Sequence, residues 1–180
     1  MNVPSAPRVR SPERHPTERP DMDPLLDLLK KNAREPDAVL AKELGVTEAD
    51  IRARIADYQA EGVIRGFQAV LNTERLDSTD VRAVIELRIR PEREGGFDRI
   101  ATRISKFPQV ESMFLMSGGY DLLLFVKGKS LQEVANFVSA RLAPLDGVLS
   151  TATHFMLKTY KDQGVLMESE PHDDRLQVCP

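Results

Sequence analysis

The spacing of the hydrophobic positions changes once along the chain. Between residues 37 and 62, apolar residues recur at intervals of three and four, which places their side chains on one face of a helix. Between residues 81 and 89, apolar positions alternate with mostly charged ones, which is typical of a strand. The pattern therefore predicts a helical N-terminal unit followed by a domain that contains a sheet.

Two short helices with a tight turn between them are predicted in the N-terminal unit. The first spans about residues 37–44 and ends at Gly45, and the second runs from Thr47 to Gly62. Thr47 is of a residue type that caps helices, and Asp50 occupies the position of a capping-box acid. Two short helices joined by a glycine-containing turn indicate a helix-turn-helix, whose second helix would enter a DNA major groove.

A third helix is expected before these two. Asp23 and Pro24 suit the cap and the first turn of a helix that continues to about Asn32. The predicted organisation of the chain is a disordered extension, a helix-turn-helix unit, a β connector, a sheet domain and a flexible tail, at 1–21, 22–62, 63–76, 77–163 and 164–180. The alternative for the extension is a basic arm that touches DNA.

The second domain follows the order β-α-β-β-α-β, which predicts a ferredoxin-like fold and places the whole chain in the α+β class. Its third strand, around Leu122–Val126, is apolar on both faces, although a sheet with helices on one side has a second face open to water. We expect a second copy of the chain to cover that face, and the alternative cover is the helical unit. The strands are expected at 81–89, 110–116, 120–127 and 148–160, and the helices at 97–107 and 131–142.

Composition and charge limit the functions that the chain can have. No apolar run approaches the ~20 residues of a membrane helix, and no secretory signal opens the chain, so a cytoplasmic protein is expected. The single cysteine, Cys179, excludes an intrachain disulfide and a cysteine-based zinc site. The net charge is −3 overall and −2 over residues 22–72, so any DNA affinity must depend on where the charges lie.

Several sequence motifs together carry a resemblance. They are L-L-D-L-L-K-K-N-A-R, L-A-K-E-L-G-V-T, E-G-V-I-R-G-F-Q-A-V-L-N, S-G-G-Y-D-L-L-L-F-V and G-V-L-S-T-A-T-H-F-M-L-K. Over residues 22 to about 163 the chain resembles the Lrp/AsnC, or feast/famine, family of transcription regulators. The resemblance implies a winged-type helix-turn-helix that binds DNA, and a second domain that oligomerises and senses an amino acid or a similar metabolite. Pro36, Glu48, Asp50 and the pair Tyr58-Gln59 depart from the residues usual in that family.

The face of the second motif helix opposite its apolar positions supplies the candidate DNA contacts. Arg52 is the first candidate for a base edge, because arginine to guanine is the commonest specific contact. Arg54 is expected to meet a phosphate or an acidic neighbour such as Asp57, and each lysine has the alternative of being a solvated surface charge. The remaining candidates are Thr47, Glu48, Ala49, Ala53, Lys42 and Arg34, with Lys30 and Lys31 as further phosphate contacts.

The resemblance also implies an effector site in the second domain. By that resemblance, the loop Gly118-Gly119-Tyr120-Asp121 and the paired Thr151 and Thr153 would contact an amino acid, with backbone N–H groups facing its carboxylate and Asp121 its ammonium group. The alternative is purely structural, with turn glycines, a turn acceptor and ordinary strand threonines. No cofactor or metal is expected.

Two other functions compete with the regulator. The siroheme decarboxylases resemble the same family and are enzymes, but the chain has no nucleophile-base pair and His154 stands alone on a strand. We therefore expect no catalytic residues. The acidic motif helix also allows a metabolite-sensing or partner-binding protein that has lost DNA binding.

Overall fold

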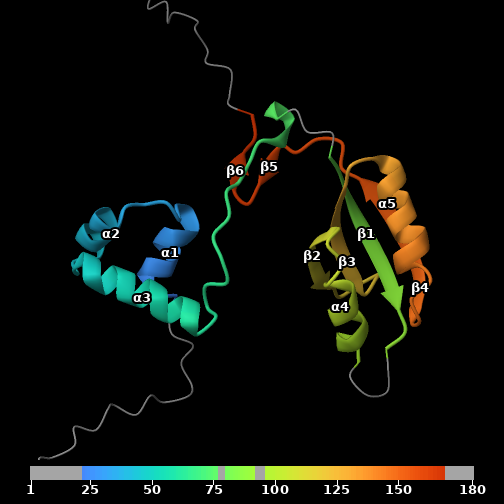
Figure 1. The fold of residues 1–180 in the computed structure, drawn as a ribbon, viewed down its shortest axis with the longest axis horizontal. Helices are drawn as coiled ribbons and strands as arrows, with labels where there is room; N and C mark the ends of the chain where they lie inside the picture. Colours follow the sequence, from blue (N-terminus) through green and yellow to red (C-terminus); the bar gives the residue numbers. More distant parts are fainter. Residues whose placement is uncertain (1–21, 77–79, 92–95, 169–180) are drawn as a thin grey trace, which may run out of the picture. The chain divides into compact units, whose positions relative to one another are not determined.

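The structure is a computed structural model that describes residues 22–76, 80–91 and 96–168. The chain divides into two compact units between Ala69 and Val70 (Figure 1). The predicted N-terminal extension lies outside the described residues, as does the predicted tail after residue 168.

The first unit contains the three predicted helices: α1 (Pro24–Lys31), α2 (Asp37–Leu44) and α3 (Glu48–Ala60). Asp23 caps α1 by accepting a hydrogen bond from a first-turn N–H. Gly45 ends α2 in the left-handed conformation, with a φ of 67°, which glycine adopts without steric conflict. The two predicted motif helices are thus present, with α3 ending at Ala60, two residues before the predicted end at Gly62.

The predicted capping box at the start of α3 is present with both of its bonds. The Asp50 N–H donates to the Thr47 hydroxyl oxygen at 3.2 Å, and the Thr47 N–H donates to the Asp50 carboxylate at 3.0 Å. The three helices enclose a small core. Its buried members are Leu25, Leu29, Leu40, Ala41 and Ile51, with Leu28, Leu44, Ile55, Tyr58 and Ile64 packed against them.

The predicted β connector is not a strand. No residue of the segment 63–72 belongs to a strand in the described chain, and a short 3-10 turn, η1 (Thr73–Arg75), follows it. The β-rich composition was correctly associated with an extended backbone, but a strand also needs a neighbouring backbone to bond with. None of the described strands pairs with this segment.

The second unit contains the predicted β-α-β-β-α-β order, and its strands are all antiparallel in the sheet order β2-β3-β1-β4. This confirms the ferredoxin-like fold. The second helix of the unit, α5, continues directly into one π-helical turn, η2. The elements are β1 (Val81–Ile89), α4 (Asp98–Ile104), β2 (Val110–Leu115), β3 (Leu122–Gly128), α5 (Leu131–Phe137), η2 (Val138–Leu142) and β4 (Val148–Phe155).

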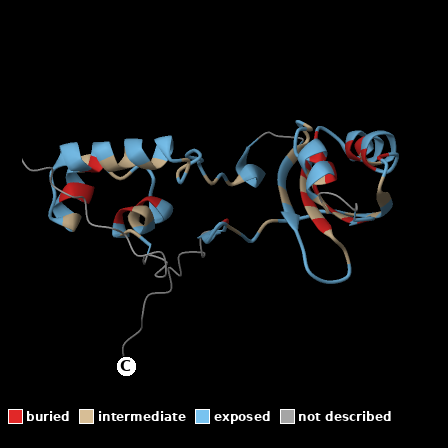
Figure 2. Cartoon of the chain, turned by 90° about the horizontal axis from the view of Figure 1, so that it is seen from below, coloured by how far each residue is buried: buried red, intermediate tan, exposed pale blue. Residues whose placement is uncertain are grey.

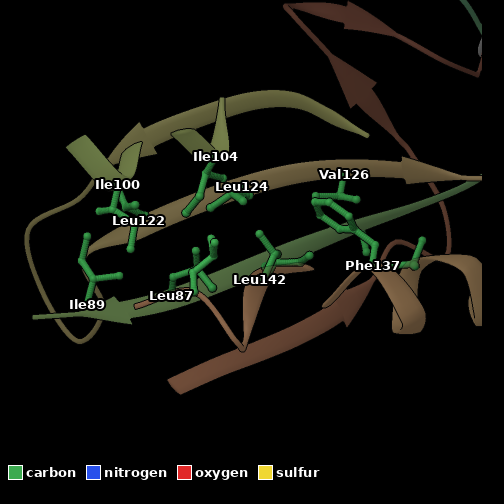
Figure 3. Packing of buried hydrophobic residues seen from close by; sticks show 13 residues of the cluster. Leu87, Ile89, Ile100, Ile104, Leu122, Leu124, Val126, Phe137 and Leu142 are labelled. Carbon is green, nitrogen blue, oxygen red and sulfur yellow. The ribbon is translucent and has the colours of Figure 1, made fainter. Parts of the chain in front are cut away.

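One face of the sheet packs against the helices. Figure 3 shows Leu87 and Ile89 of β1 and Leu122, Leu124 and Val126 of β3 turned toward side chains of the helical elements, namely Ile100, Ile104, Phe137 and Leu142. The opposite face carries Val84, Leu123 and Phe125, which are half-buried in the single chain, and Phe114, which is 50% exposed. The rings of Phe114 and Phe125 meet edge to face, with centroids 6.2 Å apart.

The last predicted strand was too long, and a small hairpin after it was missed. β4 ends at Phe155, and β5 (Lys161–Asp162) then pairs with β6 (Val165–Leu166). Gln163 and Gly164 turn the hairpin with φ angles of 45° and 88°. Residues 164–168 therefore belong to the domain and not to a tail. The side-chain amide of Asn72 donates to the backbone carbonyl of Met167 at 2.6 Å, which ties the hairpin to the start of the unit.

Candidate DNA-binding and effector sites

Helix α3 buries one side and exposes the other. Ile51 is fully buried against α1 and α2, whereas Glu48, Ala49, Arg52 and Ala53 are all exposed. In Figure 2 this helix, the longest of the first unit, is coloured as exposed along its outer side. The structure thus brings four of the predicted DNA contacts onto one exposed surface, on an element held by a capping box and a packed core.

Arg52 lies between two carboxylates. Its Nε–H donates to Asp37 Oδ2 at 3.0 Å, and its Nη2 donates to Glu48 Oε2 at 2.9 Å. The Glu48 pair has the i,i+4 spacing of one helical turn, but Asp37 comes from the first turn of α2. Sequence reasoning identified Arg52 and Glu48 as surface residues and did not predict the bond to Asp37.

Arg54 points to a different partner from the one expected. Its Nη2 donates to both carboxylate oxygens of Asp23, and the Tyr58 hydroxyl donates to the same carboxylate. The predicted pair with Asp57 is not formed. Arg54 was expected to meet a phosphate or an acid, and the acid proves to be the cap of α1, which links α1 to α3.

The ionisation of this cluster follows from its contacts. Burial raises the pKa of Asp23. The hydrogen bonds from Arg54, Tyr58 and the Leu25 N–H, together with the charge of Arg54, lower this pKa by a larger amount, so it lies below the usual value. The hydrogen bond to Asp23, with burial, raises the pKa of the Tyr58 hydroxyl, which stays protonated. The cluster is therefore a charged Arg54–Asp23 pair closed by a neutral tyrosine.

The other candidate phosphate contacts differ in whether their side chains already have partners within the protein. Lys42, in the last turn of α2, and Arg34, in the loop before α2, are exposed and form no ion pair within the described part of the chain. The Thr47 hydroxyl donates to Asp50 Oδ2 at 2.7 Å, so its proton is already used in the capping box. The hydrogen bonds of that box also lower the pKa of Asp50.

The predicted effector loop is a tight turn between β2 and β3. Gly118 has a φ of 139°, and the Asp121 carboxylate accepts a bond from the Ile89 N–H at 2.8 Å, beside a register shift in the pairing of β1 with β4. The Arg88 Nε–H donates to the Gly119 carbonyl at 2.6 Å. Arg88 was not predicted as part of this site. One role of Asp121 is consequently structural.

The two threonines lie elsewhere in the same sheet. Thr153 and Thr151 pair with Ile85 and Leu87, so they are on the helix-covered face of β4. Because β1 lies between β3 and β4, two strand spacings, roughly 10 Å, separate them from the Asp121 loop. The Asp121 N–H donates to the Leu87 carbonyl, so the loop and Thr151 flank the same residue of β1 from opposite sides.

The described residues contain no group of three or more His, Cys, Asp or Glu side chains placed to hold a metal ion. No helix among them is long and apolar enough to cross a membrane. His154 contacts one acid, with its Nε2 3.4 Å from Glu86 Oε1 on the open face of the sheet.

Comparison with known proteins agrees with this architecture. Residues 82–166 match the Lrp/AsnC ligand binding domain family. Over 157 residues the chain is 39% identical to the uncharacterised HTH-type transcriptional regulator YugG of Bacillus subtilis, covering 87% of this chain and 95% of that protein. The chain belongs to the Lrp/AsnC family of transcriptional regulators. The regulator LysM of Saccharolobus solfataricus is 32% identical over 136 residues, with 76% of this chain and 91% of LysM covered.

Solved structures of Lrp/AsnC members share the fold. The transcriptional regulator NMB0573 of Neisseria meningitidis, solved in complex with L-methionine, superimposes with a TM-score of 0.61 and 25% identity, over 77% of this chain and 88% of that one. The predictions of family, fold class and regulator function are therefore confirmed. The candidate contact residues themselves stay predictions.

Proposed function

We propose that this Lrp/AsnC regulator binds specific DNA sequences through the exposed face of α3. The observation that carries the proposal is the placement of Arg52 on that face, at the surface of a capped helix whose opposite side is buried. Its guanidinium, flanked by the small residues Ala49 and Ala53, would contact base edges in a major groove. Lys42 and Arg34 would contact phosphates, which position the helix without sequence preference.

The second domain would bind an amino acid and assemble the protein. A ligand binding domain family covers it, and the structurally similar regulator NMB0573 was solved with L-methionine. The Asp121 loop and Thr151, which flank Leu87 of β1 from opposite sides, would contact the amino acid, and a second copy of the chain would cover the open face of the sheet. Phe114, Leu123 and Phe125 on the open sheet face offer an apolar surface for that copy.

The first experiment is DNA binding of the full chain to fragments upstream of its own coding region and to unrelated DNA of equal length, over a series of salt concentrations. We expect a preferred fragment whose advantage survives as salt rises, because base contacts depend less on counterion release than phosphate contacts do. Binding that is weak, blind to sequence and lost with salt would contradict the proposal.

A regulator that has lost DNA binding is the second candidate, and a specific observation favours it. Arg52 is paired with Asp37 and Glu48, and the unit has an excess of acidic residues. The protein would then act by binding an effector or a partner, and the salt series would find no preferred fragment. In either case the chain would have no catalytic role.

A further inference from the structure

Arg52 is held by carboxylates from two different helices. Asp37 lies in the first turn of α2 and Glu48 in the first turn of α3, so the guanidinium bridges the two helices of the motif. The bonds are 3.0 Å from Nε to Asp37 Oδ2 and 2.9 Å from Nη2 to Glu48 Oε2. Two bonds from separate helices fix the plane of a guanidinium better than one bond does.

These two bonds leave one end of the guanidinium free. An arginine has five N–H donors, and here one on Nε and one on Nη2 are used. The three remaining donors lie on the terminal nitrogens Nη1 and Nη2. Guanine presents two adjacent acceptors, O6 and N7, in the major groove, and such a pair of terminal donors can contact both. The Arg52 side chain is 63% exposed, so this end is accessible.

We propose that Asp37 and Glu48 are positioning residues that pre-orient Arg52 toward a guanine. The inference rests on the DNA-binding function proposed above and deepens it, because it assigns a base specificity to one residue and a reason for two acids on a DNA-facing surface. A long side chain that is already ordered loses less conformational freedom on binding. The acids would then increase the preference for guanine while reducing the general attraction to phosphates.

The surface position of the pairs makes the inference testable. Ion pairs between side chains that are 63%, 50% and 37% exposed contribute little to stability. Asp37→Asn together with Glu48→Gln, the brace variant, should therefore fold. Its control is Glu43→Gln with Asp57→Asn, which also removes two negative charges from the motif helices. The side chains of Glu43 and Asp57 are exposed and form no bond or ion pair among the described residues.

The experiment selects preferred sites from random double-stranded DNA with the full wild-type chain. It then measures the affinity for every single-base change in the selected site. We expect one guanine position whose preference is lost in Arg52→Ala. At that same position the brace variant should lose about two- to tenfold of its preference, which corresponds to one side chain freed to move. The brace variant and the control variant should bind unrelated DNA more tightly by a similar factor, since each loses two negative charges.

A second comparison separates positioning from general charge. In an Arg52→Ala background, the brace substitutions should have no further effect on base preference, because the side chain that they orient is absent. If the brace and control variants change base preference equally, Asp37 and Glu48 are ordinary surface partners and the inference is overturned. It is also overturned if the brace variant binds its site more selectively, because the acids would then mask Arg52. A wild-type chain with no preferred site would overturn the proposed function itself.

Discussion

The contact between Asp23 and helix α3 gives the sharpest prediction about stability. The Asp23 carboxylate caps α1 through the Leu25 N–H, at 2.9 Å, and accepts hydrogen bonds from Arg54 and Tyr58 of α3. Asp23→Ala would remove all of these bonds at once. Loss of an N-cap costs about 1 kcal/mol, and loss of the bonds to the partly exposed Arg54 and to Tyr58 costs about 1–2 kcal/mol more. The expected destabilisation of the helical unit is about 2–3 kcal/mol.

This change is large for a unit of this size. A core of five buried residues in a unit of fewer than about 70 residues supplies only about 3–5 kcal/mol. Asp23→Ala should therefore leave the unit with only about 0–3 kcal/mol of stability and a readily detected unfolded fraction, while the ferredoxin-like domain keeps its structure. Hydrogen exchange of the full chain, followed separately in α1–α3 and in β1–β4, measures both units in one sample.

The matched control is Asp27→Ala. Asp27 is exposed in the first turn of the same helix, and within the described chain its side chain has no bonded partner. Its removal should cost only the interaction with the helix dipole, about 0.3–1 kcal/mol. The two variants are compared by how much each lowers the free energy of opening of the α3 amides. If the two decreases differ by less than about 0.5 kcal/mol, Asp23 does not stabilise α3, and the reasoning is refuted.

Three further changes test other parts of the structure. The pKa of Asp23 is lowered in the fold, so the contribution of its ionised carboxylate to the stability of α1–α3 is present above about pH 4 and is lost as the pH falls through the folded pKa. The stability of α1–α3 should therefore fall less steeply with acid in Asp23→Asn than in the wild type, and equal pH profiles would contradict this. Gly45→Ala should destabilise the helical unit by about 1 kcal/mol in urea, because its φ is 67°, whereas Gly66→Ala, with no positive φ, should not. Phe114→Glu should reduce the oligomeric mass measured by light scattering, because it places a charge on the apolar open face of the sheet. Leu131→Glu, at a similarly exposed position of α5, should leave that mass unchanged.

Local features of the fold could be predicted from sequence because their signals lie within a few residues. The capping box depends only on Thr47 and Asp50, and the end of α2 depends only on Gly45. The β5–β6 hairpin had a weaker signal, Asp162-Gln163-Gly164, since Gln163 rarely takes a positive φ. The segment 63–72 shows the opposite limit: it was predicted as a β connector but forms no strand, because a strand needs a neighbouring backbone that composition does not reveal.

Contacts between distant residues could not be predicted in the same way. Arg54 and Asp23 are 31 positions apart, and Arg52 and Asp37 are 15 apart. Such pairs depend on the angle at which two helices cross and on which side chain reaches across. From sequence, Asp57 was an equally reasonable partner for Arg54. The effector residues have a similar limit, because the strand order β2-β3-β1-β4, which places the Asp121 loop and Thr151 on either side of β1, is not a local signal.

These contacts change the meaning of the acidic charge in the motif. Counted from sequence, the acids of α3 weaken the case for DNA binding, because each repels phosphate. In the structure, Asp50 closes the capping box and Glu48 bonds Arg52, so each has a local role on the helix. Asp23, which lies outside the motif, forms an ion pair with Arg54. Part of the acidic charge therefore has a structural role in capping and fastening α3, whereas Asp57 has no such contact among the described residues. Lys42 and Arg34 form no ion pair in the described chain and would be available to the DNA backbone. A DNA-binding unit of this kind would gain its selectivity from ordered side chains, with a small phosphate contribution, and its specific binding should depend less steeply on salt than that of a strongly basic motif.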